Sequence, residues 1–322
     1  MRYRALGKTG FSISEVGYGA WGIGQSGWIG AKDDESIQAL HKAIELGLNF
    51  IDTALAYGDG HSEQLVGQVV REHAQKIYVA SKIPPKNGQW PARNGVDVND
   101  VFPGSYVREC TERSLRNLGL DAIDVQQFHV WSDEWVGHGD WLDEIAKLKQ
   151  EGKIKAFGVS INDHQPENAI LLLETGVVDS VQVIYNLFDQ SPEDALFAAC
   201  ERYHVGVIVR VPLDEGGLTG RITPDTEFPE GDFRAHYFRG DRKQEVAKRV
   251  QTLAEDLGVA VENVAELALR YTLSHPVVST VIPGMRSIRN VEHNCAISDG
   301  HTLSVDQLEK IKAHRWDRNF YS

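Results

Sequence analysis

The feature that most constrains the fold of this chain is a regular alternation of short apolar runs with amphipathic stretches. The apolar runs, each predicted to form a strand, are 15–20, 48–53, 76–81, 122–130, 156–160, 180–186, 205–211 and 277–282. Helical patterns lie between them, for example at 34–47, 62–73, 105–119, 139–152 and 191–204. Strands that alternate with helices form a parallel sheet, and eight such strands close it into a barrel without exposed edges. The sequence therefore predicts an α/β fold, a single (β/α)8 TIM barrel that spans residues 1–322 as one domain.

Segments outside this alternation indicate additions to the barrel. Residues 3–16 have the pattern of a short hairpin, which we expect to cap the bottom of the barrel. Two other stretches are longer than the repeat requires, 212–240 and 286–322, and the second is long enough for extra C-terminal helices. Connections of this length in a barrel are usually functional.

Residues 17–22, GYGAWG, fit the G-x-G-x-x-G pattern of nucleotide-binding folds. That pattern indicates a phosphate-binding loop only when a helix begins within it. Here the first helical periodicity begins at Asp33. The glycines therefore need another explanation than a dinucleotide phosphate loop.

Charge and cysteine content narrow the class of protein. The net charge of -13 disfavours nucleic acids and anionic membranes as partners. The N-terminus has no apolar leader pattern, and no apolar stretch is long enough to span a membrane. Three widely spaced cysteines favour reduced thiols over disulfides or a metal site. We expect a cytoplasmic enzyme without a metal.

Titratable side chains gather where three consecutive predicted strands end. Asp52 ends the second strand and Tyr57 follows in its loop, Lys82 ends the third strand, and His129 ends the fourth. In a barrel the active site lies at the carboxyl ends of the strands. Each residue alone has a structural alternative, such as a loop cap, a salt bridge or a packed side chain. The joint pattern favours catalysis.

These four residue types suit proton transfer to a carbonyl oxygen. A lysine cation beside a tyrosine lowers the pKa of its phenol, which is otherwise near 10. Tyr57 would be the general acid, Lys82 would lower its pKa, Asp52 would orient Lys82, and His129 would position the substrate oxygen. A metal-dependent hydrolase is disfavoured, because His129 alone among the histidines closes a strand.

The chain resembles the aldo-keto reductase family over nearly its whole length. The strongest match is GLNFIDTALAYGDGHSEQLVG, supported by VASK, IDVQQFHV, KIKAFGVS and QVIYN. The resemblance implies an NADPH-dependent carbonyl reductase with the tetrad Asp52, Tyr57, Lys82 and His129. It also places GYGAWG at the first strand and its loop, where small residues let nicotinamide and substrate approach the backbone.

The resemblance implies an extended cofactor across the barrel top, with NADPH preferred and NADH possible. Ala20, Trp21 and Asp52 would lie near its reacting end, and Ser160 and Gln182 match residues that bind the nicotinamide carboxamide. The family's usual pair is an adjacent Ser-Asn, whereas Asn162 here lies one position later.

The seventh strand departs from the family pattern. Many members place a tyrosine there to stack on nicotinamide, but this chain has Arg210. A guanidinium also offers a flat face for stacking, and the alternative is a salt bridge to a nearby carboxylate. The following segment resembles the family's pyrophosphate belt, and the contacts expected there are Pro212, Leu213, Gly217 and Leu218.

At the adenosine end, 281–294 occupies the family's phosphate-binding loop and the start of its helix. This chain has Gly284, Met285 and Asn290 where a common version has Lys, Ser and Arg. Arg286 would supply the cation for a 2'-phosphate, Ser287 and the helix start would add donors, and Asn294 matches the usual adenine contact.

Substrate contacts are expected from Tyr57, His129 and tryptophans in loops at the barrel mouth. These are Trp21, Trp28, Trp90 and Trp131. They favour an apolar or sugar-stacking pocket for a small-molecule carbonyl or sugar substrate. The tail 314–322 is short and should form little of a lid. We expect a monomer or a small homo-oligomer.

Two other functions stay open at this point. The same tetrad serves a dehydrogenase that oxidises a sugar or an alcohol. Alternatively, the chain could be a nicotinamide-sensing regulatory subunit, because relatives of this fold bind cofactor as channel auxiliaries.

Overall fold

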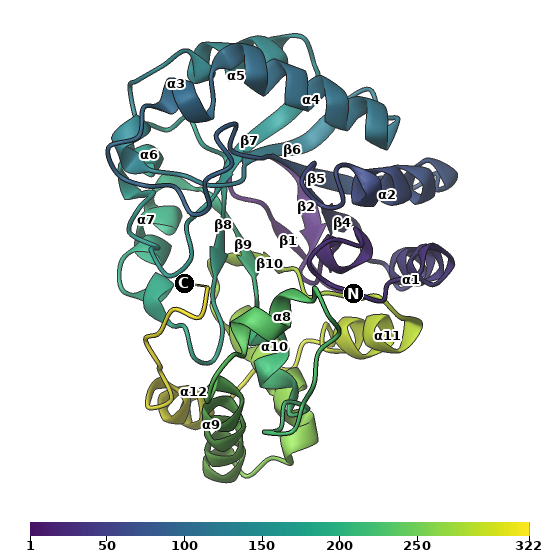
Figure 1. Cartoon of the computed structure of the whole chain (residues 1–322), viewed down its shortest axis with the longest axis vertical. Helices are drawn as coiled ribbons and strands as arrows, with labels where there is room; N and C mark the ends of the chain where they lie inside the picture. The colour runs from purple at the N-terminus through teal and green to yellow at the C-terminus, as the bar shows by residue number, and fades with distance from the viewer. Residues whose placement is uncertain (322) are drawn as a thin grey trace.

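The computed structural model describes residues 1–321, and eight parallel strands form one sheet in it. The sheet curls around one axis (Figure 1). In chain order the strands are β3 (Tyr18–Gly19), β4 (Phe50–Asp52), β5 (Tyr78–Ile83), β6 (Ile123–Phe128), β7 (Ile154–Ser160), β8 (Ser180–Ile184), β9 (Gly206–Arg210) and β10 (Val278–Val281). Each strand pairs with the next, and bridges from Val16 to Val281 and from Gly19 to Gly284 join the first strand to the last. The predicted (β/α)8 barrel is confirmed.

Helices surround the strands on the outside (Figure 1). They are α1 (Asp33–Glu45), α2 (His61–Glu72), α3 (Val98–Val101), α4 (Gly104–Leu118), α5 (Trp141–Gln150), α6 (Ile170–Glu174), α7 (Leu196–Tyr203), α8 (Phe233–Tyr237), α9 (Arg242–Leu257), α10 (Val264–Ser274), α11 (Ile288–Ala296) and α12 (Val305–Lys312). Short 3-10 turns are η1 (Trp21–Ile23), η2 (Asp133–Trp135), η3 (Ser191–Glu193), η4 (Asp214–Thr219) and η5 (Val261–Asn263). The helical patterns predicted from the sequence coincide with α1, α2, α4, α5 and α7 to within a few residues.

The inside of the barrel is filled at its lower end by apolar side chains from alternate strand positions. Phe50, Val125 and Ile208 belong to this interior cluster and are fully buried. Leu6 and Ile13 of the N-terminal segment complete it from below. Because the interior is closed here, ligands have access only from the opposite end.

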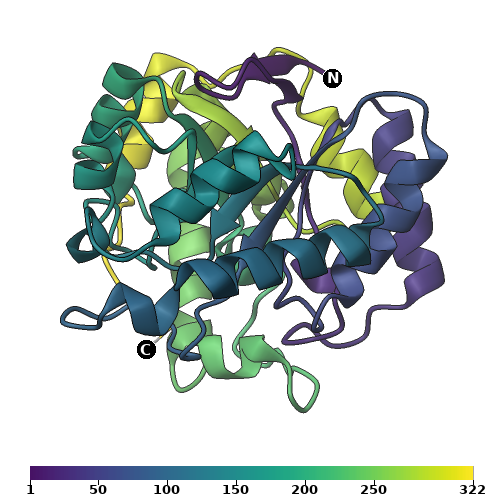
Figure 2. The same cartoon turned by 90° about the horizontal axis from the view of Figure 1, so that it is seen from above.

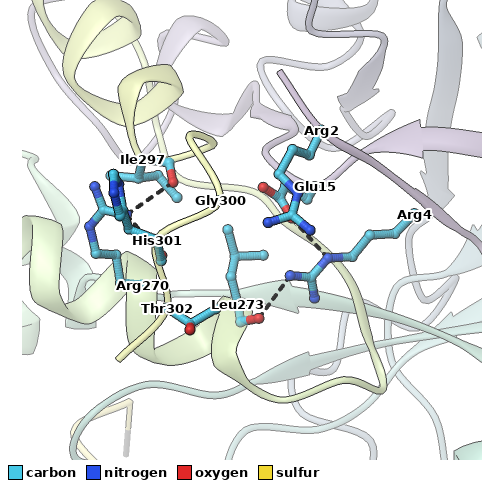
Figure 3. A pocket seen from close by; sticks show the side chains of 9 residues that line it. All are labelled: Arg2, Arg4, Glu15, Arg270, Leu273, Ile297, Gly300, His301 and Thr302. Atoms are coloured by element: carbon cyan, nitrogen blue, oxygen red, sulfur yellow. Dashed lines mark hydrogen bonds and ion pairs between the residues drawn. The ribbon is translucent and has the colours of Figure 1, made fainter. Parts of the chain in front are cut away.

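The N-terminal hairpin that covers this lower end consists of β1 (Tyr3–Ala5) and β2 (Ser12–Ser14), as predicted. Arg4 ties it to the barrel. Its guanidinium donates to Glu15 Oε2 at 2.9 Å and to the Leu273 carbonyl at 2.8 Å (Figure 3). It also donates to the Val278 carbonyl at 2.9 Å. The small hollow beside it has a volume of about 10 Å³, room for one water at most. Arg4 therefore acts as a structural anchor.

The long connection at 212–240 and the chain end lie at the opposite end of the barrel from the hairpin, as Figure 2 shows from above. The connection contains η4 and α8, and the tail follows α12. The Phe233 amide donates to the Gly27 carbonyl at 2.6 Å, which joins this connection to the loop after β3. The upper end is thus partly covered by loops that contact one another.

Candidate active site

Adjacent strands place Asp52 and Lys82 side by side at the upper end of the barrel. Lys82 Nζ donates to Asp52 Oδ1, to the Thr53 carbonyl at 2.8 Å and to the Tyr57 hydroxyl at 3.2 Å. Lys82 is 0% and Asp52 is 2% exposed. A buried charge is costly unless it is paired and hydrogen-bonded, and this pair meets both conditions. The structure thus brings three of the four predicted residues into one hydrogen-bonded group.

The second carboxylate oxygen of Asp52 is held by two glutamine amides. Gln182 Nε2 donates to Asp52 Oδ2 at 2.8 Å, and Gln127 Nε2 donates to the same atom at 3.2 Å. Both glutamines are almost fully buried. They fix the orientation of the Asp52 carboxylate. Gln127 was not among the residues predicted from the sequence, although its position two residues before His129 places it on the same face of the strand.

His129 completes the group through ring contacts. Its ring centroid lies 5.6 Å from that of Tyr57 and 4.5 Å from that of Trp90, edge-on in both cases. His129 Nδ1 is buried and has no hydrogen-bond partner within the described chain. Tyr57, His129 and Trp90 thus form one continuous aromatic surface at the barrel mouth.

The environment sets the protonation of the tetrad. Burial raises the pKa of Tyr57, and the opposing effect of Lys82 does not cancel it. Burial disfavours the charge of Lys82, yet Asp52 and Tyr57 outweigh it and raise the pKa of Lys82. Burial, Lys82 and Arg210 hold the pKa of His129 well below its ordinary value. At neutral pH the site therefore holds a neutral phenol, a cationic lysine and a neutral imidazole.

The glycines of 17–22 and the loops above them serve close packing of the protein itself. A Cβ at Gly19 would lie 2.5 Å from the Ile282 carbonyl oxygen. A Cβ at Gly58, which has a φ of +67°, would lie 2.0 Å from the Gly24 carbonyl oxygen. At Gly19 the segment just after β10 takes the space beside the backbone, and the expectation that small residues at 17–22 let ligands approach stays a prediction. At Gly24 and Gly58, the lack of side chains lets the loop after β3 pack directly beside Tyr57.

Two neighbouring side chains fit a primary carboxamide. Ser160, at the end of β7, and Gln182, within β8, are register partners. Within residues 1–321, Ser160 Oγ and Gln182 Oε1 form no hydrogen bond, so a hydroxyl and an amide acceptor are available next to the tetrad. A carboxamide needs such a donor and such an acceptor. These residues therefore fit the nicotinamide end of an NAD(P) cofactor. Ala20 is buried at the end of β3, where its amide donates to the Asp52 carbonyl at 2.9 Å.

Arg210 forms a salt bridge, the expected alternative to stacking on nicotinamide. Its Nη2 donates to Asp163 Oδ1 at 2.6 Å and to the Ile161 carbonyl at 3.0 Å. Asp163 thus balances the charge of Arg210. Stacking of the guanidinium on nicotinamide stays a prediction, and Asp163 was not identified from the sequence.

The predicted pyrophosphate belt forms the tight turn η4. Asp214, Glu215 and Gly216 all have positive φ, which brings the backbone close around Gly217. Pro212 is buried and Leu213 is partly buried beside them. Leu218 needs a correction: its side chain is fully buried and its amide donates to the Leu213 carbonyl at 3.0 Å, so it faces the core.

The residues predicted for the adenosine end lie between β10 and α11. Gly284 is exposed and has open space around it. Arg286 Nη1 donates to the Ile29 carbonyl at 3.0 Å, and Ser287 caps α11 by accepting from the Asn290 amide at 3.3 Å. Asn294 follows one turn later and is mostly buried. In this conformation Arg286 bridges to the loop after β3.

Aromatic side chains from separate loops meet above Tyr57. The Trp21 ring lies 6.2 Å from that of Tyr57, 6.0 Å from that of Trp28 and 5.4 Å from that of Phe233. Phe233 was not singled out in the sequence, where only the aromatic content of 212–240 marked the segment. Trp28 also stacks against the Arg234 guanidinium at 4.3 Å.

The expectation that Trp131 lines the substrate pocket is corrected by its burial. Trp131 is 0% exposed and packs against Trp135 and Trp141 at ring distances of 5.7 and 5.4 Å. Its indole Nε1 donates to Asp133 at 2.9 Å. The side chain turns into the helical layer because the apolar cluster there excludes water from the whole ring.

Among residues 1–321, no three His, Cys, Asp or Glu side chains lie close enough to hold a metal ion. Within the same part of the chain, no helix is both long and apolar enough to cross a membrane.

Comparison with known proteins agrees with this geometry. The model of the Aldo/keto reductase family matches residues 15–315. The chain is 30% identical to aldo-keto reductase YhdN of Bacillus subtilis, with 97% of this chain and 92% of the relative aligned. It is 29% identical to the NADH-specific methylglyoxal reductase of Escherichia coli, with 92% and 93% aligned. A solved aldo/keto reductase of Klebsiella pneumoniae, in complex with NADP and acetate, shares 25% identity with a TM-score of 0.69, and the match covers 99% of this chain and 98% of that one.

Proposed function

Because the chain belongs to the aldo/keto reductase family, we propose that it reduces an aldehyde or a ketone to the alcohol with Tyr57 as the general acid. Family membership makes it an NAD(P)H-dependent oxidoreductase of carbonyl groups, and relatives use NADP or NADH. The observation that carries the proposal is the position of the Tyr57 hydroxyl, 3.2 Å from Lys82 Nζ and beside His129 at the barrel mouth.

The chain's own residues supply the proton and hold the substrate. The reduced nicotinamide supplies the hydride when it is bound. Tyr57 gives its proton to the carbonyl oxygen, and the Lys82 cation stabilises the phenolate that remains. Asp52 keeps Lys82 charged and in place. Neutral His129 hydrogen-bonds the carbonyl oxygen and aims it at Tyr57.

The raised pKa of Tyr57 supports reduction as the main direction. Reduction needs the protonated phenol, whereas oxidation of an alcohol needs the phenolate. Burial raises the pKa of Tyr57, so the acid form is dominant at neutral pH. Oxidation of a sugar or alcohol remains possible at the same residues at higher pH.

For the cofactor contacts we propose Ser160 and Gln182 at the carboxamide, the backbone of Pro212, Leu213 and Gly217 at the pyrophosphate, and the loop from Gly284 to Asn294 at the adenosine. Trp21 would contact both the cofactor and the substrate. A small-molecule carbonyl or sugar substrate and a monomer or small homo-oligomer are part of the same proposal. So is a cytoplasmic location, which the free thiols of Cys110, Cys200 and Cys295 support.

Replacement of Tyr57 by Phe tests the proposal, because it removes only the hydroxyl. We expect kcat for aldehyde reduction to fall about a hundred- to ten-thousandfold. The dissociation constant of NADPH, measured by fluorescence titration, should stay within about twofold, since the phenol contributes no phosphate contact. A Tyr57→Phe variant that keeps its kcat would refute the general-acid role. A wild-type protein that binds NADPH but reduces no aldehyde or ketone in a broad panel would instead support the sensor alternative.

A further inference from the structure

The position of Asn162 differs from that of a cofactor ligand. Asn162 lies just beyond β7 and is 5% exposed. Its Oδ1 accepts from the Ala92 amide at 3.1 Å, and its Nδ2 donates to the Ala92 carbonyl at 3.1 Å. The remaining Nδ2 hydrogen is directed to Gln165 Oε1 at 3.1 Å. Both N–H donors of this side chain are therefore in use, and neither is available for a nicotinamide carboxamide.

The segment that Asn162 holds carries Trp90. Residues 87–94 are mostly exposed and lie in the loop between β5 and α3. Within the described chain, two hydrogen bonds between Asn162 and Ala92 attach this segment to a distant part of the barrel. The Gly88 amide donates to the Pro85 carbonyl at 3.0 Å within the same loop, and the amide of Gly95, just after the segment, donates to Glu134 Oε2 at 2.6 Å. The two bonds between Asn162 and Ala92 resemble one rung of a strand pair, so they fix both the position and the direction of the backbone at Ala92.

Trp90 in turn faces the reaction centre. Its ring lies 4.5 Å from the His129 ring at 84°, and its side chain is 47% exposed. A half-exposed indole beside the residue that positions the substrate oxygen forms a wall against which a flat apolar group can pack. The Arg210 charge is balanced by Asp163, so this wall is not accompanied by an unpaired cation that would favour anionic substrates.

We propose that Asn162 is a positioning residue that determines substrate specificity. Its hydrogen bonds to Ala92 hold the 87–94 segment so that the Trp90 ring lies against His129. Trp90 in this position selects carbonyl substrates with a flat aromatic group. This inference rests on the proposed carbonyl reduction at Tyr57. Asn162 acts through Trp90 and does not touch the cofactor.

The test compares Asn162→Ala with a matched control. Asn168 makes the same kind of bracket, with Oδ1 accepting from the Asp133 amide and Nδ2 donating to the Trp131 carbonyl, both at 2.9 Å. It holds a different loop, one that does not carry Trp90. The substrates are 4-nitrobenzaldehyde and propanal, and the cofactor is NADPH.

We expect Asn162→Ala to raise KM for 4-nitrobenzaldehyde about tenfold, the effect of losing roughly one net hydrogen bond that orders the wall. Because propanal has no ring to pack on Trp90, its KM should change less than about twofold. The NADPH dissociation constant should also stay within about twofold. Asn168→Ala should lower the thermal midpoint but leave the ratio of the two KM values unchanged.

Trp90→Ala provides the second arm. It should raise KM for 4-nitrobenzaldehyde as Asn162→Ala does, and the double variant should add little, because both changes remove the same wall. If Asn162→Ala weakens NADPH binding tenfold and leaves the KM ratio unchanged, Asn162 is a carboxamide ligand and the inference is overturned. Multiplicative effects of the two single changes would overturn it too. A wild-type protein that reduces neither aldehyde would count against the proposed function itself. If the wild type reduces both aldehydes and Asn162→Ala leaves the ratio of their KM values unchanged, the inference alone is overturned.

Discussion

Tyr57 is subject to two opposing electrostatic effects, and their balance decides how it works. Burial raises its pKa, while Lys82 at 3.2 Å lowers it, and burial is the larger effect. Lysine therefore does not make the free phenol strongly acidic. It limits the increase in pKa and provides a cation for the phenolate formed during reduction.

Replacement of Lys82 by Met tests this role. Reduction requires the protonated Tyr57, so activity is lost as pH rises through the pKa of Tyr57. Without Lys82 that pKa rises further, and the alkaline limb of the kcat profile should move upward while the plateau falls about a hundredfold or more. The pH dependence of kcat measures both effects. Lys86→Met, at an exposed position, is the control, and an unmoved limb in Lys82→Met would contradict the role.

The double variant Tyr57→Phe with Lys82→Met checks that the two residues serve one step. We expect it to lose much less activity than the product of the two single losses, because the second change removes assistance to a proton that is already absent. Multiplicative losses measured in kcat would show that the residues act separately.

The sequence located the tetrad because its members follow the ends of consecutive strands, and parallel strands bring those ends together. It did not reveal Gln127, since a buried glutamine within a strand gives no periodic signal of what it contacts. It also missed Asp163 as the partner of Arg210, because the two are 47 positions apart and their pairing depends on loop geometry. Trp131 was misplaced because a tryptophan after a strand end can turn outward into the helical layer as readily as toward the mouth.

At the scale of elements, one cation makes several of the bonds that attach the hairpin formed by β1 and β2. Arg4 joins Glu15, the end of α10 and the start of β10. Glu15 is 3% exposed, and its other oxygen accepts from Ser298 Oγ at 2.8 Å. One side chain therefore fastens three elements at the closed end of the barrel.

Arg4→Met should lower the free energy of unfolding by roughly 3 kcal/mol, because it leaves the Glu15 carboxylate buried without its cation. Urea denaturation measures the change. Arg2→Met is the control, since the exposed Arg2 guanidinium forms no hydrogen bond within the described chain, and we expect a change of at most about 0.5 kcal/mol. Adding Glu15→Gln to Arg4→Met should restore part of the loss, and equal losses in Arg4→Met and Arg2→Met would disprove the anchoring role.

The tail and the turn η4 are joined through a buried carboxyl. Tyr321 donates its hydroxyl to Glu215 Oε1 at 2.7 Å, and Glu215 is 7% exposed. Burial raises the pKa of Glu215 to about 7, although Tyr321 and Arg210 oppose this, while Asp214 and Asp163 add to it. The tail is short, as expected, yet it contacts the turn predicted to bind the pyrophosphate.

A raised carboxyl pKa makes stability depend on pH with a definite sign. Glu215 is protonated in the folded protein up to about pH 7, whereas in the unfolded chain it ionises near 4.3. Between these values the folded state holds the extra proton, so stability falls as pH rises, by roughly 4 kcal/mol in total. In Glu215→Gln this fall should be absent. Urea denaturation should therefore show that the free energy of unfolding decreases less between pH 5 and pH 8 in the variant than in the wild type. The exposed Glu230→Gln should show the wild-type profile, and the same profile in Glu215→Gln would mean that Glu215 ionises normally.

At the scale of the whole molecule, the barrel was predictable because eight apolar runs with helices between them allow few other closed sheets. The short α6 was not predicted, since a helix of five residues has too few turns to show periodicity. The coverage of the upper end depends on contacts such as Phe233 to Gly27, which join segments about two hundred positions apart and leave no local pattern. Local sequence patterns thus predict the closed barrel, but they do not predict the loop contacts that cover its upper end.

Arg286 connects this closure to the choice of cofactor. It donates to the Ile29 carbonyl at 3.0 Å, and its side chain lies against Gly22, so it sits between the loop after β3 and the start of α11. A cation at this junction can contact a 2'-phosphate, which NADPH has and NADH lacks. Arg286 thus has a structural role that affects both cofactors and a proposed charge role that affects one.

Arg286→Ala separates the two roles. Loss of a charge-assisted contact should weaken NADPH binding about ten- to a hundredfold. NADH binding should weaken less, because NADH is affected only by the loss of the hydrogen bond between Arg286 and the Ile29 loop. In a thermal shift measurement, a cofactor present at about 100 times its dissociation constant stabilises the folded protein by roughly 2.7 kcal/mol, and a tenfold weaker affinity lowers this by about 1.3 kcal/mol. The stabilisation by NADPH should therefore shrink much more than that by NADH, each at a fixed concentration. Arg289→Ala, at an exposed position in the first turn of α11, is the matched control. Equal weakening of both cofactors in Arg286→Ala would show that Arg286 has only the structural role, through its bond with Ile29. Selective loss of NADPH binding in Arg289→Ala would show that Arg289 binds the 2'-phosphate instead.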